Sequence, residues 1–254
     1  MKTIINQNFK YFYFARYLRK YIFRKIFLLI VLLPSFSIVN SEELIVPIHK
    51  EPKHHLVYDG ENIQIMDIKI ESGEMTLYHI HNRPILYVSI GSSYVDSQAY
   101  GQDWKGLFKT DDDLWKPGDV AFNIKYVNNE FIHRVRNTEG NLFRLIGVLN
   151  KSNLIADDVE HPNSSFPGEI EVNNEYFHQS RLSLDKEESV RWQDTGYPVV
   201  FVQVGSGSAD ILHDDGTQIS LSSSGKYIVE DSNKSFEVKN TGSQPVTYII
   251  VELH

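Results

Sequence analysis

The 254-residue sequence contains no cysteine. This absence excludes a disulfide framework, a thiolate metal site and a thiol nucleophile. Residues 1–41 also lack any Asp or Glu, although they contain seven Lys or Arg. Residues 42–254 therefore carry all 33 acidic residues against 18 of the 25 basic ones, a net charge of −15. Such an acidic body lacks the basic surface of a nucleic-acid-binding protein. Gly-rich phosphate loops and nucleophile-elbow motifs are absent as well.

The first 41 residues have the composition of a targeting segment. An apolar run at residues 26–33 follows the basic residues and precedes a stretch rich in small residues at 35–41, which is typical of a secretory signal. An uncleaved membrane anchor and a buried helix are the alternatives. The apolar stretch of residues 26–39 is shorter than the roughly 20 residues that a spanning helix needs. We therefore expect a secreted or periplasmic protein that touches a membrane only if this segment is not cleaved.

Beyond residue 58 the sequence is typical of an all-β protein. Hydrophobic residues make up 41% of the chain, and short apolar runs alternate with Gly, Asn, Asp and Ser, which indicates a sandwich or barrel. Residues 84–92 match residues 198–206, and residues 135–138 match residues 238–241. These matches predict two equivalent β domains, 42–150 and 178–254, joined by a connector at 151–177. The first copy holds extra residues within 101–118.

Three histidines occur at spacings that combine into one pattern. His79 and His81 are two residues apart, so on a strand both side chains share a face. Gly73 precedes His79 by six residues, Pro-Gly-Asp follows at 117–119, and His133 precedes Asn137 by four residues. This pattern resembles the cupin family, and the internal repeat extends the resemblance to a bicupin. The resemblance implies two double-stranded β-helix (jelly-roll) barrels, with His79, His81 and His133 converging on a metal.

The first motif departs from the family at one position. The family has a Glu four or five residues after the second His, but residues 82–91 contain no acid. Three-histidine cupins such as thiol and gentisate dioxygenases hold Fe(II), and Mn, Ni or Zn are compatible with the same ligands. Three neutral ligands leave a dication uncompensated, which favours an anionic substrate or a bound hydroxide. The alternative is a vestigial barrel whose histidines bond to one another or to water.

Other residues have weaker claims to the site. Tyr87 can share the face of the histidines and act as an acid or base. Arg83 can receive a substrate carboxylate, although a salt bridge at the rim is the preferred interpretation. Val135 and Phe131 are expected beside His133, and Asn137 is expected to be structural. The remaining polar candidates are expected to be solvated or merely packed: His54, His55, His161, His178, Asp111, Asp112, Asp113 and Tyr78.

The second copy is predicted to hold no metal ligand. The offset of the first match places Gln193, Asp194 and Thr195 at the positions of residues 79–81, and the second offset places Phe236 at the position of His133. Two hypotheses follow. The chain is either an exported metal-dependent dioxygenase, lyase or isomerase for a small organic molecule, or a non-catalytic exported cupin that binds a small ligand or serves a structural role. Cupins often dimerise by strand exchange, so the resemblance also allows a homodimer.

Overall fold

The structure is a computed structural model that describes residues 43–105, 109–152, 167–230, 232 and 234–254. These residues form β-strands and three single-turn 3-10 helices, η1 (Ile48–Lys50), η2 (Asp111–Asp113) and η3 (Lys125–Val127). The prediction of an all-β fold is therefore confirmed. No helix among them has the length and apolar character needed to cross a bilayer. The predicted signal segment and His161 lie outside the described residues.

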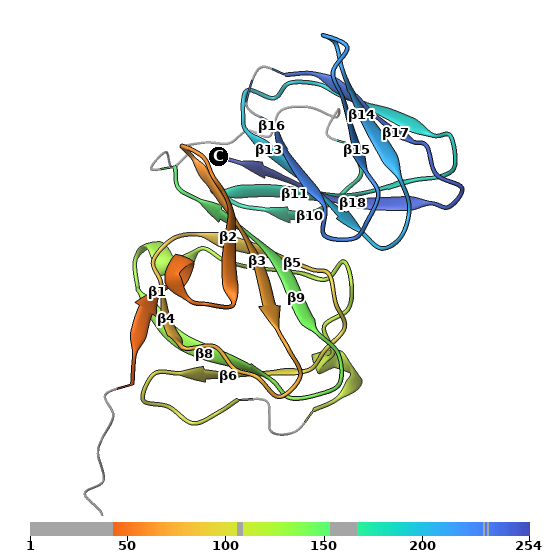
Figure 1. The fold of residues 1–254 in the computed structure, drawn as a ribbon. Coiled ribbons are helices and arrows are strands. Elements are labelled where there is room, and N and C mark those ends of the chain that lie inside the picture. The colour runs from red at the N-terminus through yellow and green to blue at the C-terminus, as the bar shows by residue number, and fades with distance from the viewer. Residues whose placement is uncertain (1–42, 106–108, 153–166, 231, 233) are drawn as a thin grey trace, which may run out of the picture. The chain divides into compact units, whose positions relative to one another are not determined.

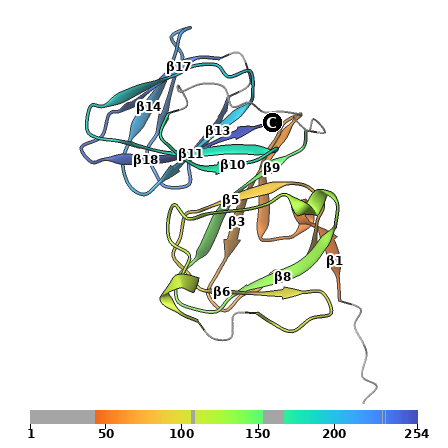
Figure 2. The ribbon, with the colours of Figure 1, turned by 180° about the vertical axis from the view of Figure 1, so that it is seen from behind.

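The first half of the described chain consists of two sheets (Figure 1). The first outer sheet contains, in order, β1 (Ile45–Pro47), β4 (Tyr78–His81), β8 (Phe131–Asn137) and β6 (Val95–Ala99). The first inner sheet contains β2 (His54–Asp59), β3 (Ile63–Ile70), β9 (Phe143–Asn150), β5 (Ile85–Ser89) and β7 (Val120–Asn123). Seen from behind in Figure 2, β8 and β6 again lie opposite β3 and β5.

The second half also consists of two sheets. The second inner sheet contains β10 (Glu169–Asn173), β11 (Phe177–Leu184), β18 (Val246–Leu253), β13 (Val199–Val204) and β16 (Tyr227–Glu230). The second outer sheet contains β12 (Ser189–Trp192), β17 (Phe236–Asn240), β14 (Ala209–His213) and β15 (Gln218–Leu221). Strand β10 lies within the range expected to be connector and pairs with β11. The two inner sheets have the same order of equivalent strands, and β4-β8-β6 corresponds to β12-β17-β14.

The central strands of the inner sheets, such as β5, β9, β13 and β18, are buried on both faces, which explains their continuous apolar runs. On β5, Ile85 and Tyr87 pack in a core that also contains residues of the first outer sheet, whereas Leu86 and Val88 pack against the second inner sheet. Successive side chains of a strand point to opposite faces, so one strand serves two cores. A third core fills the space between the second inner and second outer sheets. The core shared by the two inner sheets includes Val200, Val202 and Ile249 opposite the β5 residues.

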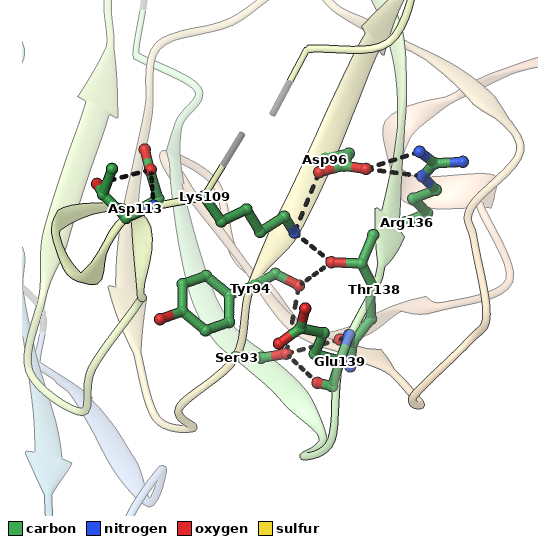
Figure 3. Close-up of polar contacts among 10 residues, drawn as sticks. Ser93, Tyr94, Asp96, Lys109, Asp113, Arg136, Thr138 and Glu139 are labelled. Carbon is green, nitrogen blue, oxygen red and sulfur yellow. Dashed lines mark hydrogen bonds and ion pairs between the residues drawn. The ribbon is translucent and has the colours of Figure 1, made fainter. Parts of the chain in front are cut away.

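A buried ion network holds the extra residues of the first half on its outer sheet (Figure 3). Asp96 of β6 is buried, and its carboxylate lies 3.1 Å from Lys109 Nζ and 2.7 Å from Arg136 Nη2. Lys109 also donates to the hydroxyl of Thr138. A buried carboxylate requires such compensation. The middle of the 101–118 stretch is thereby tied to β6 and β8. The Asp111–Asp113 run within it is exposed, as expected, and forms η2.

Candidate metal centre

Two neighbouring strands of the first outer sheet supply the three predicted histidines. Strands β4 and β8 are antiparallel, and His79 lies directly opposite His133. His81 is two residues beyond His79, so its side chain points to the same face. That face is directed to the core between the two sheets, where Val135 of β8 packs. The strand register therefore brings all three imidazoles into one cluster, with Phe131 in ring contact with His133 at 4.9 Å.

The imidazole nitrogens of the cluster lie close enough to share one cation. One ring nitrogen from each histidine lies within 4.8 Å of the others. The Nε2 atoms of His81 and His133 are 2.9 Å apart. Nitrogen ligands at about 2.1 Å around a tetrahedral ion lie roughly 3.4 Å from one another. The geometry is therefore close to that of a three-histidine site.

The other nitrogen of each ring has a partner behind it. Nδ1 of His79 donates to the carbonyl of Leu77 at 3.0 Å. Nδ1 of His133 lies 3.1 Å from Ser97 Oγ, and Nδ1 of His81 lies 3.5 Å from the hydroxyl of Tyr87. Partners of this kind fix the tautomer and orientation of metal-ligating histidines. Each Nε2 is thus the nitrogen left for the centre of the cluster.

Burial keeps the three histidines neutral at pH 7. It lowers the pKa of His79 to about 4. Burial and the neighbouring His79 lower the pKa of His133 to about 3. The pKa of His81 is also well below its usual range, because of burial first and His133 second. Metal ligands must not be protonated to imidazolium, so these side chains have the neutral charge that a cation requires.

A fourth histidine, which was expected to be solvated, belongs to this cluster. His54 at the start of β2 is 6% exposed, and its ring meets that of His79 edge-on at 4.5 Å. Burial and His79 hold its pKa well below the usual value. The expectation was wrong for His54 and correct for His55, which is exposed. Adjacent strand residues face opposite ways, so only one of the two could point inward.

A buried carboxylate stands behind His54. Glu51 is buried, and its Oε2 lies 3.4 Å from Nδ1 of His54. Its two oxygens also accept from the backbone N–H groups of Leu77 (3.1 Å) and Lys53 (2.6 Å). Burial raises its pKa, and the two backbone bonds oppose that rise. A buried acid from the segment before β2 therefore lies beside His54, although no acid follows His81 in the motif.

Tyr87 and Tyr126 lie at the histidine cluster, whereas Arg83 and Tyr78 do not. Tyr87 lies beside His81, and burial raises the pKa of its phenol well above the usual value. Tyr126, which the sequence did not single out, contacts the ring of His81 at 4.9 Å. Arg83 is exposed and donates to the carbonyl of Lys151 at 3.0 Å. Among the described residues it forms no ion pair, so the expected rim salt bridge is not found. Tyr78 faces away from the cluster and packs against Tyr100.

Asn137 is structural, as expected. It is buried at the end of β8, and its amide donates to the carbonyls of Ile70 (2.9 Å) and Asn141 (2.6 Å). Its Oδ1 accepts from the hydroxyl of Ser93 at 2.6 Å. The side chain of Asn137 therefore links the end of β8 to three neighbouring segments and is not part of the histidine cluster.

The corresponding position of the second half holds aromatic rings. Trp192 of β12 lies opposite Phe236 of β17, as His79 lies opposite His133. The residue at the position of His79 is therefore Trp192, one residue earlier than the expected Gln193, and residues 193–195 follow the strand. Trp192 stacks on Phe236 at 6.1 Å and meets Phe201 edge-on at 5.5 Å. His178, expected at the surface, is 2% exposed.

Comparisons with known proteins place the fold. No family model matches the sequence, and no curated protein matches it. A cupin 2 conserved barrel domain protein from Leptotrichia buccalis is 15% identical, with a TM-score of 0.50 over 78% of this chain and 87% of that one. AerE from Microcystis aeruginosa is 11% identical, with a TM-score of 0.54 over 80% and 98%. A salicylate 1,2-dioxygenase from Pseudaminobacter salicylatoxidans is 9% identical, with a TM-score of 0.52 over 75% and 70%. Likeness at such low identity concerns the fold alone. The described residues have the fold of cupin-domain proteins, as the histidine spacing predicted.

Proposed function

We propose that the chain is an exported bicupin that holds a divalent metal through His79, His81 and His133 and converts a small organic anion. The observation that carries this proposal is the convergence of three neutral imidazoles, each with its second nitrogen occupied from behind. The fold shared with a salicylate 1,2-dioxygenase is one that can accommodate a reaction of this kind. In this proposal each pair of sheets is one jelly-roll barrel, the first within residues 42–150 and the second beginning at β10 and running from 169 to 254. Residues 1–41 are a cleaved signal.

The charge of the three ligands indicates which class of substrate the metal would bind. Neutral histidines do not offset the two positive charges of the metal, and the carboxylate of Glu51 contacts His54 rather than any of the three ligands. A substrate carboxylate or enolate would supply the missing charge. Fe(II), Mn, Ni and Zn are all compatible with imidazole ligands. The bound metal would supply Lewis-acid chemistry, or O₂ chemistry with iron, in dioxygenase-, lyase- or isomerase-type reactions.

The protein groups around the cluster would orient the substrate and handle its proton. Tyr87 is the best-placed acid or base, because its hydroxyl lies 3.5 Å from His81 and its raised pKa keeps it protonated at pH 7. Tyr126 and Phe131 stack at 5.5 Å beside the same histidines and offer an apolar wall. Arg83 is a weaker candidate for binding the substrate carboxylate, since its guanidinium already donates to the backbone carbonyl of Lys151.

A non-catalytic role is the alternative, and one contact favours it. The direct hydrogen bond between His81 and His133 allows the cluster to persist without any cation. In that case the chain would be an exported ligand-binding or structural cupin.

Metal analysis of the purified full chain tests the proposal. One equivalent of metal at the cluster is expected in the wild type, and His79→Ala should lose it. His55→Ala is the matched control, because His55 is exposed and next to the cluster segment in sequence. Oxygen uptake or product formation is then followed with iron, manganese, nickel or zinc and a panel of small carboxylates. Failure of any metal to bind at this cluster after reconstitution would favour the non-catalytic role.

A further inference from the structure

A second group of two histidines and one glutamate lies inside the second half of the chain. His178 of β11 is paired with Glu252 of β18 across the antiparallel strands. His254 follows Glu252 by two residues, which is the same spacing that places His79 and His81 on one face. The residues His178, Glu252 and His254 are 2%, 0% and 3% exposed. All three are thus withdrawn from solvent at one end of the second inner sheet.

The strand pattern shows which side of the sheet these residues occupy. Leu182 and Leu184 of β11, and Tyr248 and Ile250 of β18, belong to the core between the second inner and second outer sheets. His178 and Glu252 are separated from them by even numbers of residues, so they face the same interior. The group therefore extends this core at its polar end.

The distances within the group are compatible with a shared cation. Nε2 of His254 lies 3.0 Å from Oε1 of Glu252, and Nδ1 of His178 lies 4.0 Å from the same oxygen. One ligand atom from each residue lies within 4.8 Å of the others. Ligand atoms around tetrahedral zinc are roughly 3.4 Å apart. Side-chain movements of about 1 Å would close the group around an ion.

The charge of Glu252 requires a counter-charge. Its Oε2 is buried, and among the described residues it has no hydrogen-bond partner. Within the same part of the chain no Lys or Arg forms an ion pair with Glu252. A second buried glutamate of this half, Glu230, differs in this respect: it lies 3.2 Å from His213 and 3.4 Å from the ammonium of Lys234. Among the described residues the side chains in ion-pair range of Glu252 are His178 and His254. A buried carboxylate without a full counter-charge costs several kcal/mol, and a divalent cation bound by all three residues would remove that cost.

We propose that His178, Glu252 and His254 form a second metal site, of the class that takes Zn²⁺. Two imidazoles and one carboxylate, which can bind through both oxygens, are a common zinc donor set. The site does not correspond to the first cluster. The residues of the first half at the positions of His178 and Glu252 are Gln64 and Leu149. The ion would join β11 to β18 and stabilise the second half. The proposal is independent of any catalysis at the first cluster.

Metal titration of the full chain tests this site. The background variant is His79→Ala/His81→Ala, which removes the first cluster. Equilibrium dialysis with Zn²⁺ should give one equivalent in this background, and Co²⁺ should give the visible d–d bands of a low-coordinate site. Adding Glu252→Gln should weaken binding at least 100-fold. Adding Glu230→Gln instead is the matched control, since it changes a buried glutamate beside a histidine of the same half, and should leave one equivalent.

Thermal unfolding separates loss of the site from loss of the fold. Zn²⁺ should raise the Tm of the background variant and of its Glu230→Gln derivative, and should not raise that of the Glu252→Gln derivative. If Glu252→Gln does not fold, His254→Asn in the same background replaces it, with the same expectation. A folded background variant that binds no zinc would overturn the proposal, as would retention of tight binding after Glu252→Gln. Both outcomes are measured in a variant that lacks the first cluster, so they do not depend on the proposed function. The proposed function is tested separately, in the wild type.

Discussion

Acid should destabilise the metal-free protein through its buried histidines. In the folded chain burial lowers the pKa of His79 to about 4, whereas an unfolded chain has a histidine pKa of about 6.5. Above about pH 6.5 both states are neutral at this residue, and it has no effect on stability. Below that pH the unfolded state binds a proton that the folded state excludes. Stability is therefore lost as the pH falls from about 6.5 to about 4.

The size of this effect follows from the difference between the two pKa values. A difference of about 2.5 units at 1.36 kcal/mol per unit corresponds to about 3 kcal/mol once the pH has fallen below 4. At pH 5, where the unfolded histidine is almost fully protonated, the loss due to His79 is about 2 kcal/mol. This is a large part of the 5–15 kcal/mol typical of a folded protein.

Urea unfolding of the chelator-treated chain at pH 7.5 and pH 5 measures the effect. The free energy of unfolding of the wild type should fall by about 2 kcal/mol more than that of His79→Gln, which has no proton to gain. His55→Gln serves as the control and should behave like the wild type, because His55 is exposed. Equal losses in the wild type and in His79→Gln would refute the conclusion that folding excludes a proton from His79.

Three further predictions concern Glu51, Tyr87 and Trp192. Glu51→Gln places an amide NH₂ against one of the two backbone N–H groups that donate to the Glu51 carboxylate. It should lower the free energy of unfolding by about 1–3 kcal/mol. The control Glu74→Gln changes an exposed partner of Lys53 and should cost far less. Tyr87→Phe, compared with the wild type at the same metal loading, should lower kcat by about 10²-fold on any substrate that is turned over, so an unaltered kcat would exclude Tyr87 as acid or base. Trp192→Ala should cost about 3–5 kcal/mol in chemical unfolding while metal at the first cluster is retained. A loss of that metal from folded protein would contradict the assignment of Trp192 to the core between the second inner and second outer sheets.

The sequence was sufficient to predict the three-histidine part of the site, because the alternation of side chains along a strand and the spacing of the motif determine it. His79 and His81 lie on one face of β4 because they are two residues apart, and the spacing of His133 placed it on the partner strand. The all-β fold followed from apolar runs bounded by turn residues. These signals are local, or are carried by a short motif, and need no knowledge of how distant segments meet.

The rest depended on chain paths that no local signal specifies. His54 reaches the cluster because η1 and the start of β2 lie next to β4. From the sequence one could say only that His54 and His55 face opposite ways. At the second half, a one-residue difference in offset separated Trp192 from Gln193. Such a shift exchanges the two faces of a strand, so the identity of the residue opposite Phe236 required the register itself.

The core shared by the two inner sheets bears on how such a chain changes in evolution. Here the second inner sheet covers Leu86, Val88, Ile146 and Val148 of the first. A gene shortened to the first half would encode a protein with this apolar face open to water, and faces of that kind promote association. Selection for solubility would therefore preserve the half without the three-histidine cluster, whatever that half binds.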